Sequence, residues 1–116
     1  MSTRQTGNRY ELAVCEMAEA LGYAAFKARG SRGCVDVVCF KAEHSPGRCI
    51  PLRPLAIQVG TANKAIAATL RDLDAAPRPI GSRCIVARRK LTKSRRVVWS
   101  FHTQAGTFAT LAEAIA

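Results

Sequence analysis

Three oxygen-bearing side chains stand where the 116-residue sequence could bring them together around a hard metal ion. Asp36 interrupts the β-favouring run 34–40, and Gln58 interrupts the apolar run 55–59. Two adjacent antiparallel strands would place these side chains close together, and carboxylate and amide oxygens suit Mg²⁺ or Mn²⁺. Glu11, on a helical pattern near the N-terminus, is a candidate third ligand. The spacing therefore predicts a divalent-metal site.

Each of these residues also has a purely structural interpretation. A buried carboxylate needs a partner, and Asp36 can obtain one by pairing with an arginine or by capping backbone amides. Gln58 can be a hydrogen-bonded strand amide, and Glu11 a solvated acid favoured by the positive end of its helix. Lys64, near the start of the second helical segment, either reaches a bound phosphate or is simply exposed.

The elements that must position these residues follow from hydrophobic periodicity and turn signals. Three- and four-residue spacing of apolar residues predicts helices, and β-branched runs predict strands. The order is α-β-β-β-α-β-β-α, which predicts one α/β domain over 1–116 with a mixed central sheet flanked by helices. Helices are expected at 7–21, 61–75 and 108–116, and strands at 23–28, 34–40, 55–59, 82–87 and 97–101.

Two connecting segments have a distinct composition. The prolines and glycine of 43–54 predict a hairpin loop without regular structure. The run 88–96 contains six cationic residues between two strands and is expected to form an exposed hairpin tip, or a merely solvated turn.

The charge balance points to a polyanionic partner. Eighteen Lys and Arg residues against eight Asp and Glu give a net charge of +10, and each cation placed on a phosphate releases counterions. An acidic membrane surface or acidic protein remains an alternative. The 48% hydrophobic content argues against disorder, no apolar stretch is long enough to span a membrane, and a cytoplasmic protein with reduced cysteines is expected. The candidate DNA-binding residues are Arg4, Arg9, Lys27, Arg29, Arg32, Arg88, Arg89, Lys90, Lys93, Arg95 and Arg96.

Taken in order, these motifs resemble the PD-(D/E)XK nuclease superfamily, and within it the small archaeal and phage Holliday-junction resolvases. Those proteins present a glutamate on the first helix, a Gly/Ser turn before a strand bearing aspartate, and a strand ending in E-x-K or Q-x-K. The matching stretches here are 6–11, 29–31 leading into 35–38, and 57–60. The resemblance spans roughly residues 4 to 75, and each motif is short, so its specificity lies in their joint order.

The resemblance implies a restriction-endonuclease-like α-β-β-β-α-β core and a Mg²⁺ (or Mn²⁺)-dependent endonuclease acting on branched DNA. Asp36 would be a direct metal ligand, Gln58 the second ligand, Glu11 an outer or direct ligand, and Ser31 a turn serine near the scissile phosphate. Hydrolysis would leave 5′-phosphate and 3′-hydroxyl ends. Because a four-way junction is cut on two symmetric strands, a C2 homodimer in the cytoplasm, or in host cytoplasm for a phage protein, is expected.

The chain departs from this pattern at Gly60, which stands where the family has its lysine. In one explanation Lys64 is that lysine relocated, and the site is active. Alternatively the site is degenerate and the protein only binds DNA. A third reading is a basic structural subunit in which Asp36 is a salt-bridged core residue. The apolar tail residues Phe108, Leu111, Ala112 and Ile115 either form the dimer contact or pack on their own sheet.

Overall fold

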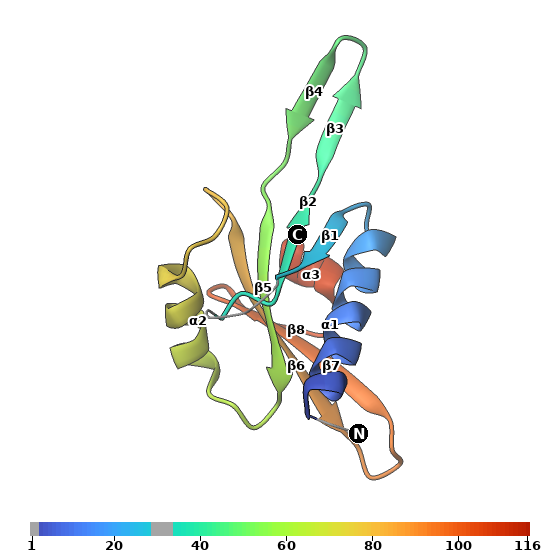
Figure 1. The fold of residues 1–116 in the computed structure, drawn as a ribbon, viewed down its shortest axis with the longest axis vertical. Helices are drawn as coiled ribbons and strands as arrows, with labels where there is room; N and C mark the ends of the chain where they lie inside the picture. Colours follow the sequence, from blue (N-terminus) through green and yellow to red (C-terminus); the bar gives the residue numbers. More distant parts are fainter. Residues whose placement is uncertain (1–2, 29–33) are drawn as a thin grey trace.

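A six-stranded mixed sheet with helices on both faces organises the computed structural model, which describes residues 3–28 and 34–116 (Figure 1). The elements are α1 (Thr3–Ala20), β1 (Ala24–Lys27), β2 (Val37–Phe40), β3 (Ala42–Ser45), β4 (Arg48–Pro51), β5 (Leu55–Thr61), α2 (Ile66–Ala75), β6 (Arg83–Leu91), β7 (Val97–Thr103), β8 (Gly106–Phe108) and α3 (Leu111–Ile115). The predicted fold class, an α/β domain with a mixed central sheet, is confirmed.

The strand order of the sheet is β1-β2-β5-β6-β7-β8. β1, β2 and β5 form an antiparallel meander, α2 crosses over so that β6 runs parallel to β5, and β7 and β8 return antiparallel. This is the predicted meander followed by a helical crossover. Because β5 and β6 are parallel, their carboxyl ends lie at the same edge of the sheet.

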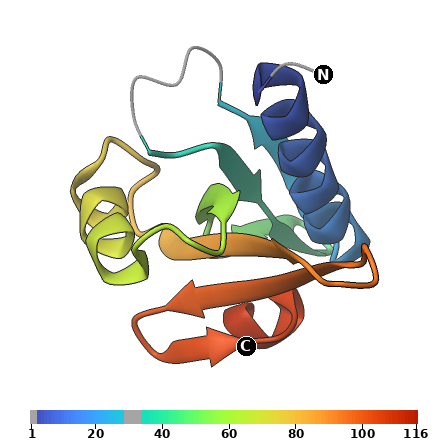
Figure 2. The same cartoon turned by 90° about the horizontal axis from the view of Figure 1, so that it is seen from below.

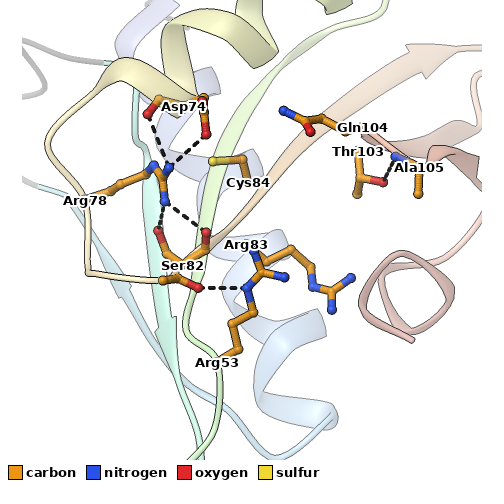
Figure 3. Close-up of a pocket in the computed structure, with 10 residues that line it drawn as sticks. Arg53, Asp74, Arg78, Ser82, Arg83, Cys84, Thr103, Gln104 and Ala105 are labelled. Atoms are coloured by element: carbon orange, nitrogen blue, oxygen red, sulfur yellow. Dashed lines mark hydrogen bonds and ion pairs between the residues drawn. The ribbon is translucent and has the colours of Figure 1, made fainter.

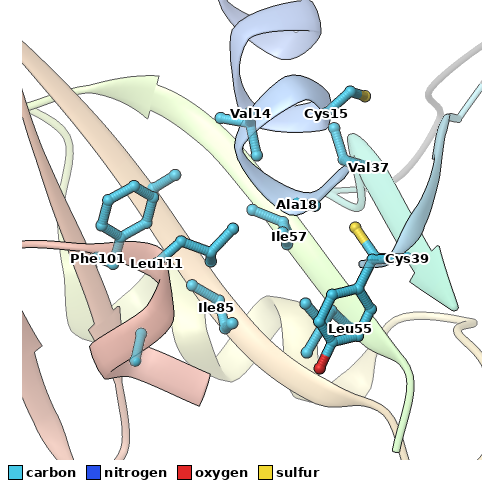
Figure 4. Close-up of a cluster of buried hydrophobic side chains, with 13 residues drawn as sticks. Val14, Cys15, Ala18, Val37, Cys39, Leu55, Ile57, Ile85, Phe101 and Leu111 are labelled. Atoms are coloured by element: carbon cyan, nitrogen blue, oxygen red, sulfur yellow. The ribbon is translucent and has the colours of Figure 1, made fainter. Parts of the chain in front are cut away.

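The two faces of the sheet carry separate apolar clusters. On one face, α1 and α3 pack on the central strands, with Val14, Ile57 and Phe101 among the buried residues (Figure 4). On the other face, α2 packs through Leu73 against Val86 and its neighbours. Figure 2 shows α1 and α2 on opposite sides of the central strands. Even-numbered residues of β5 therefore face α2, whereas Ile57 faces α1.

The prediction that 43–54 lacks regular structure is wrong. Strands β3 and β4 pair there as a two-stranded arm that projects beyond the main sheet (Figure 1). Pro46 and Gly47 occupy its turn, where Gly47 has a φ of 76°, and Pro51 ends the second strand. Prolines at a turn and at a strand end remove no interior ladder bond, so they are compatible with a hairpin.

Several predicted boundaries also move. The strand expected over 34–40 begins at Val37, so Asp36 lies immediately before it. The helix expected over 61–75 begins at Ile66, because β5 continues through Thr61 and a turn follows. The segment 108–116 begins with the end of β8, and α3 follows after Thr110, whose side chain accepts a hydrogen bond from the Glu113 amide as an N-cap.

The C-terminal tail packs largely on its own sheet. Leu111 is buried in the α1-side core, and Phe108 and Ile115 are partly buried against it. Ala112 is exposed.

No helix in the described ranges 3–28 and 34–116 is long and apolar enough to cross a membrane.

Candidate active site

Asp36 is held at the junction of three strands. Its backbone carbonyl accepts from the Ala28 amide at 2.8 Å, and its own amide donates to the Ile57 carbonyl at 2.9 Å. Its carboxylate accepts a hydrogen bond from the Val59 amide, at 2.8 Å from Oδ2. Burial raises the pKa of Asp36, while the Val59 amide and the positive charges of Lys64 and Arg88 lower it. Asp36 thus caps one backbone amide, as its structural interpretation proposed, and lies within the electrostatic reach of two cations.

Gln58 lies opposite Asp36. The β2–β5 register pairs Val37 with Ile57, and continuing it by one step sets Asp36 against Gln58 on the sheet face covered by α2. The adjacency predicted from consecutive antiparallel strands is therefore present. The Gln58 side-chain oxygen accepts a hydrogen bond from the guanidinium of Arg88. Gln58 is thus a hydrogen-bonded strand amide, as its structural interpretation predicted, and its partner is a cation.

Glu11 reaches the same region from α1. Burial raises the pKa of Glu11, the negative charge of Asp36 raises it further, and the positive charge of Lys27 lowers it. This repulsion indicates that the two carboxylates lie in the same part of the domain. The structure thus places Asp36 beside Gln58, whereas Glu11 comes from a helix on the other face of the sheet and its place in the site stays a prediction.

Lys64 lies in the turn between β5 and α2, two residues before the helix, rather than on the helix itself. Its side chain is exposed, and its charge lowers the pKa of Asp36. Beside it, a shallow depression of about 500 Å³ is lined by Thr61, Asn63, Arg89, Lys90 and their neighbours. The carboxyl edge of β5 and β6 is therefore cationic next to the two carboxylates.

Arg88 is the residue whose place the sequence interpretation missed. The prediction that it lies at an exposed hairpin tip is wrong, because β6 continues to Leu91 and Arg88 is only 1% exposed. Cys84, Val86 and Arg88 alternate along β6, so Arg88 shares the α2-covered face with Val86. That alternation was the available signal, but it becomes informative only once β6 is paired with β5.

The donor set suits a hard divalent cation. Glu11 and Asp36 supply carboxylates and Gln58 an amide oxygen, the ligand types that Mg²⁺ and Mn²⁺ prefer. A divalent cation would relieve the repulsion between the negative charges of Glu11 and Asp36. Within the described ranges, no group of three or more His, Cys, Asp or Glu residues is placed to hold a metal ion. Asp36 and Gln58, with Glu11 from α1, are therefore the residues that would hold such an ion.

The remaining predicted site residues lie in different environments. Ser31, Arg29 and Arg32 lie outside the described residues, and Arg4 lies on α1. Arg89 is half-buried, with its guanidinium 3.9 Å from the centre of the Tyr10 ring. Lys27 is half-buried near Glu11. Arg9, Lys90, Lys93, Arg95 and Arg96 are exposed.

Arg95 is a position where a positive charge can be removed without an expected loss of fold stability. It has a φ of 62°, in the left-handed region that disfavours side chains, at the tip of the β6–β7 hairpin. We expect Arg95→Gly to leave thermal stability unchanged or to raise it by up to about 1 kcal/mol. If the hairpin contacts DNA, the same variant should reduce by about one the slope of log affinity against log salt. Calorimetry and salt-dependent DNA titration measure the two effects, and an unchanged salt slope would remove Arg95 from the DNA-binding surface.

A polar pocket of about 340 Å³ lies at the opposite, amino-terminal end of β6 (Figure 3). Arg78 donates to Asp74 and to both oxygens of Ser82, and Arg53 donates to the Gly81 carbonyl at 2.7 Å. These bonds tie the connection between α2 and β6 to the body of the domain. The pocket is accordingly explained by the fold, and it is separate from the carboxylate site.

Comparison with known proteins identifies one class of fold. No protein-family model matches the chain, and no curated protein sequence matches it. A similar solved structure is that of Hjc from Archaeoglobus fulgidus, a Holliday junction resolvase from an archaeal hyperthermophile, with a TM-score of 0.59 and 22% sequence identity. The alignment covers 94% of each chain.

The chain thus shares the fold of this resolvase structure, as the sequence resemblance predicted. Along nearly its whole length, the chain has the architecture of an archaeal Holliday junction resolvase. At this level of identity the likeness establishes the fold.

Proposed function

We propose that the protein is a divalent-metal-dependent endonuclease selective for branched DNA, in the manner of a Holliday-junction resolvase. The observation that carries the proposal is the adjacency of Asp36 and Gln58 on a resolvase-like fold, with the charge of Glu11 acting on the same region. A basic edge adjoins them, so a phosphodiester can be held where the acids are.

The proposed role of each site residue follows from the chemistry of its side chain. Glu11 and Asp36 would hold Mg²⁺ or Mn²⁺, with the amide oxygen of Gln58 beside them. When bound, such an ion polarises a phosphoryl oxygen and lowers the pKa of a bound water. The Val59 amide fixes the orientation of the Asp36 carboxylate, at 2.8 Å. Lys64, exposed next to Asp36, is positioned to meet a phosphate of the DNA backbone. Ser31 remains a candidate from the family resemblance alone.

Substrate selection is proposed to rest on backbone contacts. The exposed cations of the β6–β7 hairpin and Arg9 can contact DNA phosphates. Such contacts position the DNA backbone without reading the bases. A protein of net charge +10 with this arrangement recognises the shape of DNA more readily than its sequence. Branched DNA, with phosphates presented on several arms, fits this mode of binding.

A homodimer is proposed for paired incision. An apolar groove of about 600 Å³ runs between α1, β7 and the segment entering α3. Met17, Leu21, Val98 and Trp99 are among its lining residues, and 51% of Val98 is exposed. The tail residues Leu111 and Ala112 also line this groove, which is the candidate isologous contact.

The proposal is tested by incubating labelled four-way junction, flap and linear duplex DNA with the protein and Mg²⁺ or Mn²⁺. Incision of the junction that needs the metal and is lost in Asp36→Ala supports the nuclease. Junction binding without incision in either metal supports the alternative function, a catalytically degenerate DNA-binding protein of the same fold. Absence of DNA affinity at low salt contradicts both and favours a structural subunit.

A further inference from the structure

The site lacks a lysine at position 60, and the neighbouring strand supplies a different cation to the same space. Parallel pairing of β5 and β6 sets Gly60 directly beside Arg88. Both residues face α2, and the Arg88 side chain lies across Gly60 toward Gln58. The backbone of Gly60 is not in the left-handed region, because its φ lies outside that range. Glycine is therefore needed here for space rather than for conformation.

The space at Gly60 is measured by the contacts that an added Cβ would make. It would lie 2.9 Å from the terminal nitrogen Nη1 of Arg88 and 3.6 Å from the side-chain oxygen of Gln58. A separation of 2.9 Å is too short for a carbon and a nitrogen that are not bonded. A side chain at position 60 and the guanidinium of Arg88 thus compete for one volume, next to Gln58.

Arg88 is fixed in that volume by specific contacts. Nη1 donates to the Gln58 side-chain oxygen, and Nη2 donates to the Thr69 hydroxyl at 3.0 Å. The buried Nε has no hydrogen-bond partner. Burial lowers the pKa of Arg88, and the negative charge of Asp36 opposes that shift. A charged side chain that is 1% exposed, with one donor unused, is a costly feature for a purely structural arginine.

We infer that Arg88, a residue of β6, is the cationic residue of this site in place of the missing lysine. Gly60 leaves free the space that the Arg88 guanidinium occupies. The inference rests on the proposed function for its catalytic meaning. Arg88 acts as a positioning residue, because it donates a hydrogen bond to Gln58 and its charge acts on Asp36 together with that of Lys64. Lys64, whose side chain is exposed, is then an auxiliary phosphate contact.

The inference is tested by exchanging the two positions. Arg88→Ala should lower metal-dependent junction cleavage on the order of 100-fold. Gly60→Lys alone should lower both cleavage and melting temperature, because the two cations collide. Gly60→Lys combined with Arg88→Ala should recover at least tenfold of the activity lost in Arg88→Ala, and should melt higher than Gly60→Lys alone. Arg71→Ala, at an exposed position of α2, is the control for removing one positive charge, and it should leave cleavage unchanged.

Each outcome decides between explanations. Recovery in the double variant supports the inference, since a merely structural arginine would not be replaced by a lysine from another strand. Additive losses at the two positions, or full activity in Arg88→Ala, would overturn it. If the parent cleaves no DNA, the proposed function fails. The melting temperatures of the parent, Arg88→Ala, Gly60→Lys and the double variant, measured without metal, still decide whether side chains at positions 60 and 88 occupy the same space. If Arg88→Ala does not fold, the same comparison is made with Arg88→Met.

Discussion

Asp36→Asn is expected to abolish cleavage of branched DNA while preserving its binding. The substitution keeps the shape of the side chain and an oxygen that can accept from the Val59 amide, but it removes the charge that a divalent cation requires. Loss of several kcal/mol of transition-state stabilisation lowers the rate on the order of 10³-fold or more. Gel assays of junction cleavage and of junction binding without divalent ions measure the two properties.

The same variant should be at least as stable as the parent at neutral pH. The pKa of Asp36 is raised in the fold by burial, so the folded protein binds this proton more tightly than the unfolded chain does. The stabilising effect of protonation is complete below the unfolded value of 3.8 and is lost as pH rises through the folded pKa. Ionised Asp36 therefore costs stability at pH 7, and asparagine avoids that cost.

Denaturant unfolding of Asp36→Asn and the parent between pH 3 and pH 7 measures this difference. We expect the advantage of the variant to shrink as the pH falls and Asp36 becomes protonated. A variant that is less stable at pH 7 would show that Asp36 is chiefly a structural partner of Arg88 and Lys64, which is the structural-subunit interpretation.

Val98→Glu is expected to convert the proposed homodimer into monomers. The substitution places a carboxylate in the apolar groove between α1 and β7, where a partner's apolar surface would leave it unpaired. The dissociation constant should rise on the order of 100-fold. Sedimentation across a concentration series measures it, and simultaneous cutting of the two junction strands should fall with the dimer fraction.

Ile80→Glu provides the matched control for this change. Ile80 is fully exposed in the connection between α2 and β6 and does not line the groove. The variant introduces the same charge and should leave the association state unaltered. Equal weakening by both substitutions, or a parent that is monomeric at every concentration, would contradict the proposed interface.

The sequence predicted the parts of the site that depend on local periodicity. Asp36 and Gln58 each break an apolar run, and consecutive strands in a meander are neighbours, so their adjacency followed from strand order. Helical spacing placed Glu11 on the first helix, which α1 confirms, and its role as a ligand stays a prediction. These inferences needed only the alternation of side chains along a strand and around a helix.

Arg88 could not be placed in this way. Its partner strand β5 is reached through a crossover helix, and the register of parallel pairing is set by how α2 packs rather than by any local pattern. The Arg-rich composition of 88–96 instead suggested an exposed tip. The β3–β4 arm was missed for a related reason, because prolines were counted against strands without knowing that they fall at the turn and at a strand end.

The most direct test of the metal site is the anomalous diffraction of crystals soaked in Mn²⁺. We predict a single strong peak within bonding distance of carboxylate oxygens of both Glu11 and Asp36, and its absence from crystals of Asp36→Asn. A structure at saturating Mn²⁺ with no ion at Asp36, or with the Glu11 carboxylate turned away from it, would contradict the assignment of this fold to a working nuclease.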